Sequence, residues 1–128
     1  MEVAIEKFAI VSFIVIGLSH IFQHRAWAEF FVQLRGKGIQ GAFINALIQF
    51  PFGALIVAFH NVWHGIPAIL KIYGCALVLK CAINFIYPQL ALKSLGRVSL
   101  ERSWEFALAG AVFLGFAGML LFSLWARQ

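Results

Sequence analysis

Polar side chains interrupt the apolar stretches of this chain in pairs whose members stand four residues apart. The pairs are His20 and His24, Asn45 and Gln49, Lys80 and Asn84, and Glu101 and Glu105. At this spacing both members of a pair lie on one face of a helix. Because an unpaired polar group in hydrocarbon costs several kcal/mol, we expect the faces to point toward one another and to form a polar chamber.

The chemistry that this chamber predicts is the binding or passage of a small ion or polar solute. Lys80 and Glu105 are the expected ion pair, because the lysine stem covers a depth difference of about one helical turn. His20 would share that carboxylate or relay a proton. The predicted site consists of Lys80, Glu105, His20, Asn45, Gln49 and Asn84. The alternative is that such pairs only hold transmembrane helices together, at about 0.6 to 2 kcal/mol each.

The histidines form two H-x-x-x-H pairs, a spacing at which two imidazoles can chelate a transition metal. These pairs are His20 with His24 and His60 with His64. Since we expect them near opposite membrane surfaces, they cannot share one metal or haem, and we predict no cofactor. A haem or transition metal at one pair is the alternative, and Glu2 and Glu6 could complete an outer site. His60 and His64 also suit a purely structural role in the belt of amphipathic side chains at a membrane surface.

An enzyme is not expected. The apolar segments carry no nucleophile beside an obvious base and no membrane-embedded acid dyad. Cys75 and Cys81 lie about 240° apart on one helix, so they cannot bond to each other. Neither cysteine has a basic neighbour on its own face that would activate the thiol.

The composition places the chain in a membrane. Of its 128 residues, 62% are hydrophobic and only 12% are charged. Apolar runs of spanning length are expected as helices over residues 3–24, 39–63, 67–88 and 100–125. Pro67 suits a first helical position and Pro88 cannot extend a helix, so these prolines limit the third run. The sequence therefore predicts an all-α polytopic protein with an antiparallel bundle of transmembrane helices.

The connections between these apolar runs, and one proline within a run, also carry structural signals. Residues 25–35 carry apolar residues on one side and charged residues on the other, which predicts an amphipathic interfacial segment. Pro51 is expected to kink the second helix. Residues 89–100 are expected as a polar connection, with Ser99 as N-cap of the last helix and Glu101 in its first turn. No internal repeat is visible, so residues 1–128 are expected to form a single domain.

The net charge of +5 comes from basic residues that lie mostly between the apolar runs, so they indicate topology rather than nucleic-acid binding. One side of the membrane would hold Arg25, Arg35, Lys37, Lys93, Arg97 and Arg102, and the other Lys7, Lys71 and Arg127. By the positive-inside rule the two basic connections face the cytoplasm, and both termini lie outside. We expect a multi-pass protein of a cell inner membrane whose chamber opens to the cytoplasm.

Small residues share one side of the last helix and allow another helix to approach closely. They are Ala107, Ala111 and Gly118, with Gly115 beside them. We expect a homo-oligomer or incorporation into a larger membrane complex. A non-enzymatic accessory or assembly subunit is accordingly the main alternative to a binding or transport function.

One stretch of the chain resembles a set of small bacterial integral membrane proteins of uncharacterised function. The similar residues are Phe59, His60, Asn61, Val62, Trp63, Pro67, Gly74, Lys80, Pro88 and positions 99–105. The resemblance implies a four-helix architecture and a bacterial inner membrane. It implies no activity and no catalytic residues.

Overall fold

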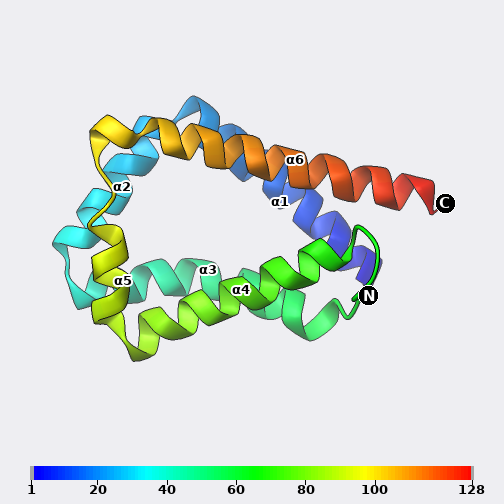
Figure 1. The fold of residues 1–128 in the computed structure, drawn as a ribbon, viewed down its shortest axis with the longest axis horizontal. Helices are drawn as coiled ribbons and strands as arrows, with labels where there is room; N and C mark the ends of the chain where they lie inside the picture. The colour runs from blue at the N-terminus through cyan, green and yellow to red at the C-terminus, as the bar shows by residue number, and fades with distance from the viewer. Residues whose placement is uncertain (1, 128) are drawn as a thin grey trace.

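The computed structural model describes residues 2–127, and nearly all of them are helical (Figure 1). The elements are α1 (Glu2–Phe22), α2 (His24–Gly36), α3 (Ile39–Phe59), α4 (Ala68–Ile86), α5 (Pro88–Leu95), the short 3-10 helix η1 (Leu100–Arg102) and α6 (Trp104–Ala126). Four of the described segments are long and apolar enough to cross a membrane, namely α1, α3, α4 and the segment Leu100–Ala126. The prediction of an all-α, multi-pass membrane protein is confirmed.

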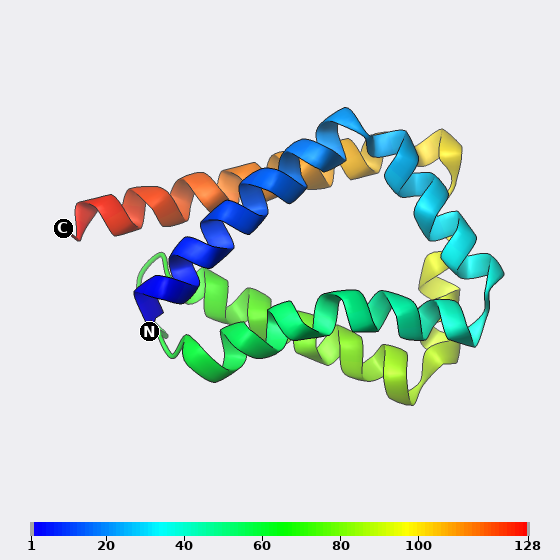
Figure 2. The same cartoon turned by 180° about the vertical axis from the view of Figure 1, so that it is seen from behind.

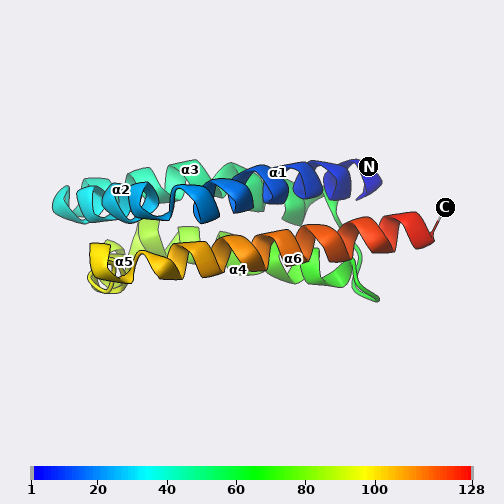
Figure 3. The same ribbon diagram turned by 90° about the horizontal axis from the view of Figure 1, so that it is seen from above.

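The four long helices form two pairs, in which α1 packs along α6 and α3 packs along α4. The pairs meet at the end that carries both termini and separate toward the other end, where α2 and α5 cross between them (Figure 2). Seen from above, α1, α2 and α3 form one layer and α4, α5 and α6 form a second (Figure 3). Each pair therefore joins one helix from each layer.

The two halves of the chain repeat the same order of a long, a short and a long helix. Exchanging the halves maps the α1–α6 pair onto the α4–α3 pair, and the packing of α2 on α6 onto that of α5 on α3. The arrangement is thus approximately two-fold. No repeat was expected from the sequence, because this relation lies in helix order and packing rather than in similar residues.

Glycines set the distance between paired helices at specific crossings. A Cβ atom at Gly110 of α6 would lie 2.5 Å from the carbonyl oxygen of Gly17 on α1, so any side chain there would force the helices apart. In the other pair, a Cβ atom at Gly74 of α4 would clash with the Ile56 side chain of α3. Close approach of this kind supplies packing energy where lipid offers no hydrophobic driving force.

Aromatic rings fill the middle of the molecule, where the pairs meet. Phe13 of α1 is only 3% exposed. Its ring stacks on Phe113 of α6 with centroids 5.5 Å apart, and it meets Tyr73 of α4 edge-on at 5.3 Å. Phe52 of α3 packs against the same cluster.

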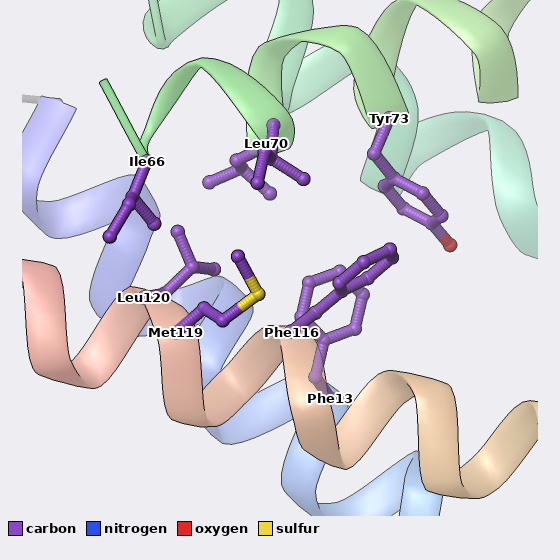
Figure 4. Close-up of a pocket in the computed structure, with 8 residues that line it drawn as sticks. Phe13, Ile66, Leu70, Tyr73, Phe116, Met119 and Leu120 are labelled. Atoms are coloured by element: carbon purple, nitrogen blue, oxygen red, sulfur yellow. The ribbon is translucent and has the colours of Figure 1, made fainter.

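Toward the terminal end, the start of α4 faces the second half of α6 across a small apolar gap. Leu70 and Tyr73 lie opposite Phe116, Met119 and Leu120 (Figure 4). The gap has a volume of only about 10 Å³, too little for more than a single water molecule. The two pairs are therefore closed against each other here.

Several predicted boundaries need correction. The first helix ends at Phe22, and the amphipathic segment is a separate helix, α2. The second long helix ends at Phe59 rather than at 63, because His60 has an extended backbone (φ −114°, ψ 98°). The helix continues through Pro51. Ser99 makes no capping hydrogen bond, and α6 begins only after η1.

Helix α5 was missed, since residues 89–100 were expected as a connection. Its buried residues are Pro88, Ala91 and Leu95, and Pro88 occupies a first-turn position. Spacings of three and four residues between buried positions, after a proline, are the signature of a short amphipathic helix. The basic residues around it obscured that signal.

Candidate functional site

A cavity of about 570 Å³ lies where the two helix pairs separate. It is lined by Phe31, Asn45, Ala76, Leu79, Lys80, Ile83, Asn84, Leu90, Ala91, Ser94, Leu95, Val98 and Phe106. These residues come from α2, α3, α4, α5, α6 and the connection after α5. We call this cavity the chamber; it lies between the two halves of the chain.

Lys80 supplies the charge of the chamber wall. It lies six residues before the end of α4, or about 9 Å along the helix axis. Its Nζ atom donates a hydrogen bond to Oε1 of Gln49 on α3, at 3.1 Å, and the side chain stays exposed. Gln49 in turn donates from Nε2 to Oδ1 of Asn45, at 2.5 Å. The ammonium is therefore held by an amide and not by a carboxylate.

Two buried amides support this wall. Asn84 of α4 is 4% exposed, and its Nδ2 donates to the carbonyl oxygen of Ala42 on α3, at 3.2 Å. Asn45 of α3 is 5% exposed and accepts the hydrogen bond from Gln49. The predicted grouping of Lys80, Asn84, Asn45 and Gln49 thus corresponds to a real cluster between α3 and α4.

The predicted ion pair between Lys80 and Glu105 is wrong. Glu105 is exposed at the start of α6, and among residues 2–127 it joins no ion pair. Its neighbour Phe106 lines the chamber instead. The reason is that α4 and α6 belong to different pairs that diverge at this end, and one residue turns a side chain by about 100° around a helix.

His20 also lies outside the chamber. Its ring stacks on Trp27 with centroids 4.3 Å apart, and its Nδ1 atom lies 2.8 Å from the carbonyl oxygen of Ile16. His24 has another partner: its Nδ1 atom lies 3.0 Å from Oγ of Ser103. The helix is interrupted at Gln23, so His20 and His24 do not share one helical face. His20 packs against Trp27, and His24 contacts Ser103 just before α6.

A second polar cluster closes the terminal end. Glu6 of α1 is fully buried, and its carboxylate accepts hydrogen bonds from Arg127 and from Nε2 of His60, the latter at 3.2 Å. His60 is also fully buried, and within residues 2–127 its Nδ1 atom has no hydrogen-bond partner. The cluster joins the first helix, the α3–α4 connection and the last helix. The sequence placed Glu6 near His60 but missed Arg127, because a contact between the chain ends leaves no local pattern.

This second cluster is not the four-residue metal site considered from the sequence. Glu2 and His64 are exposed, whereas Glu6 and His60 are buried. No group of three or more His, Cys, Asp or Glu side chains that could hold a metal ion occurs within residues 2–127. The transition-metal alternative therefore has no assembled set of three ligands in that part of the chain.

Neither a family model, nor a curated protein, nor a solved structure matches this chain. The resemblance to small bacterial membrane proteins therefore stays a prediction. What the helices establish is a multi-pass membrane protein.

Proposed function

We propose that this protein binds a small anionic solute in the chamber, at the ammonium group of Lys80. The observation that carries the proposal is an unneutralised charge. Within the described chain, Lys80 is the one charged residue that lines the chamber, and no carboxylate pairs with it. A cation held in an apolar bundle without a counterion favours an anionic ligand.

Elementary electrostatics supports an anion over a cation. At an effective dielectric constant of about 20, opposite unit charges about 4 Å apart attract by about 4 kcal/mol, and like charges repel as strongly. The amide partners of Lys80 contribute no net charge. The position of the chamber between two structurally repeated halves is also where many membrane transporters bind their substrates.

Binding is better supported than passage by a single copy. The chamber ends toward the aromatic cluster around Phe13, and the gap beyond it is only about 10 Å³. Transport would require the helix pairs to move apart at their closed end, or a second copy of the chain. We therefore propose binding as the basic activity and transport as its extension.

The orientation that fits this function has the chamber open to the cytoplasm of a cell with an inner membrane. Both basic connections, α2 with its flanks and α5 with its flanks, lie at the chamber end, and α2 contacts α5. Arg35 of α2 donates to the carbonyl oxygen of Val98 at 2.8 Å, which ties the two connections together. Positive charge gathered on one side favours the cytoplasmic surface.

Thermal unfolding of the purified protein in mild detergent tests the proposal. Sodium acetate and sodium octanoate should raise the unfolding midpoint of the wild type relative to sodium chloride at equal ionic strength, because a ligand that binds only the folded state stabilises it. The Lys80→Met variant should lose this response. The Lys93→Met variant removes an exposed charge from α5, outside the chamber lining, and should keep it. Equal responses of wild type and Lys80→Met to both anions would refute the proposal.

A second candidate function, as a subunit of an oligomer or a larger complex, is favoured by the outer side of α6. Cβ atoms built at Gly115 and Gly118 would meet nothing within 4 Å in the described chain, and Ala111 is exposed. Such a surface lets a helix from another subunit approach closely. Native mass spectrometry from mild detergent should detect an assembly in the wild type that Gly118→Leu disrupts. A wild type that is always monomeric would contradict this candidate.

A further inference from the structure

Resting on the proposed function, we propose that the anion is the headgroup of an amphiphile. Its carboxylate or phosphate lies at Lys80, and its alkyl chain lies against the apolar remainder of the chamber. Polar and apolar groups are distributed unevenly over the wall of the chamber.

The polar part of the chamber suits one headgroup but not a fully desolvated inorganic ion. Of the three protons that a lysine ammonium can donate, one is directed to Gln49, which leaves two for a ligand. The Asn84 amide group donates to Ala42, and the Asn45 carbonyl is occupied by Gln49. An inorganic anion would have most of its oxygens against apolar side chains, where lost hydration is not replaced.

The rest of the wall offers an alkyl chain a continuous apolar lining. Its residues are Phe31, Ala76, Leu79, Ile83, Leu90, Ala91, Leu95, Val98 and Phe106, with Ser94 the one polar exception among the described lining residues outside the Lys80 cluster. Leu79 and Leu90, which line the chamber, are 63% and 59% exposed, so much of their apolar surface is not covered by the described chain. The volume of about 570 Å³ falls within the range of roughly 300–1,000 Å³ that is typical of ligand sites.

The depth of the chamber fits a ligand that arrives from the membrane surface. Helices α2 and α5 are short and amphipathic and lie across the end of the bundle, as interfacial helices do. Lys80 lies about 9 Å below the end of α4, so a headgroup there would sit just beneath these helices. Two sources share the required chemistry: a free fatty acid and an anionic membrane lipid.

The experiment uses the full chain in nanodiscs of phosphatidylcholine. The probe is a twelve-carbon fatty acid with a photoreactive diazirine at the end of its chain, and labelled residues are mapped by mass spectrometry. We expect labelling of the chamber wall on α5 or α6, competed by dodecanoate at a concentration at least 100-fold lower than by acetate. The reason is that each buried methylene strengthens binding by up to about fourfold.

Two variants separate the headgroup from the chain. Lys80→Met should weaken competition by dodecanoate at least tenfold, and Lys80→Arg should restore most of it. Ala76→Trp should fill the apolar part of the chamber from an exposed position on α4 that tolerates a larger side chain. It should weaken competition by dodecanoate at least tenfold, whereas Lys93→Met, outside the chamber lining, should leave both that competition and the acetate-induced rise in unfolding midpoint at wild-type levels. An unchanged gel-filtration profile confirms that each variant is folded.

The outcomes distinguish this inference from the proposed function. If acetate competes as well as dodecanoate and both need Lys80, the amphiphile is refuted and anion binding survives. If labelling is the same in wild type and Lys80→Met, both proposals fail. In a final arm, phosphatidylglycerol is added to the nanodiscs. Reduced labelling identifies an anionic membrane lipid as a source of the ligand, and unchanged labelling identifies the free fatty acid. Both ligands have the proposed anionic headgroup and alkyl chain.

Discussion

The charged side chains at the two ends of this bundle have opposite surroundings. At the terminal end, the buried Glu6 carboxylate accepts hydrogen bonds from His60 and Arg127, and the guanidinium of Arg127 neutralises its charge. At the chamber end, Lys80 has only the amide of Gln49 as its partner beside a cavity of about 570 Å³. Charge alone therefore does not identify a site. Glu6 has its counterion within the chain, whereas Lys80 has no carboxylate partner among the described residues and also lines a cavity.

The largest effect on stability is expected at the terminal end. Replacing Glu6 with Gln removes the negative charge that pairs with Arg127 and weakens the hydrogen bond from His60, so we expect the free energy of unfolding to fall by about 3 kcal/mol. Arg127 can turn outward, because its side chain is 43% exposed, which limits the loss. Denaturation in mixed micelles measures the change. Glu2→Gln, at an exposed position of the same helix, is the control and should have no measurable effect.

A smaller loss is expected where α1 crosses α6. Gly110→Ala places a Cβ atom against the Gly17 carbonyl oxygen and should lower the free energy of unfolding by about 1 to 3 kcal/mol. Gly118→Ala makes the same change on the same helix where the described chain leaves open space. It should be neutral or stabilise by up to about 1 kcal/mol, because alanine favours helix over glycine. Equal effects of the two substitutions would show that this crossing does not hold the pair together.

A still smaller loss of stability is expected for replacing Asn84, whose amide lies in the chamber wall. Asn84→Leu keeps the side-chain volume but removes the hydrogen bond to Ala42, and should cost about 0.6 kcal/mol, as interhelical hydrogen bonds in membranes do. Unfolding in mixed micelles gives the value. A loss as large as that of Glu6→Gln would mean that the chamber wall carries as much of the stability as the terminal end.

The smallest effect on stability is expected for Lys80 itself. Lys80→Met removes one exposed hydrogen bond together with an unneutralised charge, so the free energy of unfolding should stay within about 0.5 kcal/mol of the wild type. The same variant should lose the response to anions. Loss of binding with stability retained is what separates a ligand site from a structural contact, and a strongly destabilised Lys80→Met protein would place Lys80 with Glu6 as a structural residue.

Much of the fold could be predicted from local sequence, apart from α5 and several helix ends, and the errors at the candidate site were about partners. The four apolar segments and the amphipathic segment at 25–35 all became helices. The cluster of Lys80, Asn84, Asn45 and Gln49 was also predicted, because α3 and α4 are joined by a short connection and must lie side by side. Glu105 and His20 were misplaced, since their positions depend on how α6 and α1 pack, which polar spacing within one helix does not specify.

Hydropathy and length are properties of consecutive residues, so they suffice to identify the segments that can cross the membrane. The lysine and the amides within those segments can be read from the chain in the same way. Which acid meets which cation depends instead on how the helices pack. Because α1 packs along α6, Glu6 and Arg127 lie close enough to form an ion pair. Because α4 and α6 diverge, Lys80 lies beside an open chamber. Contacts between distant segments follow from helix packing, and small residues such as Gly17 and Gly110 set that packing at distances of a few ångströms.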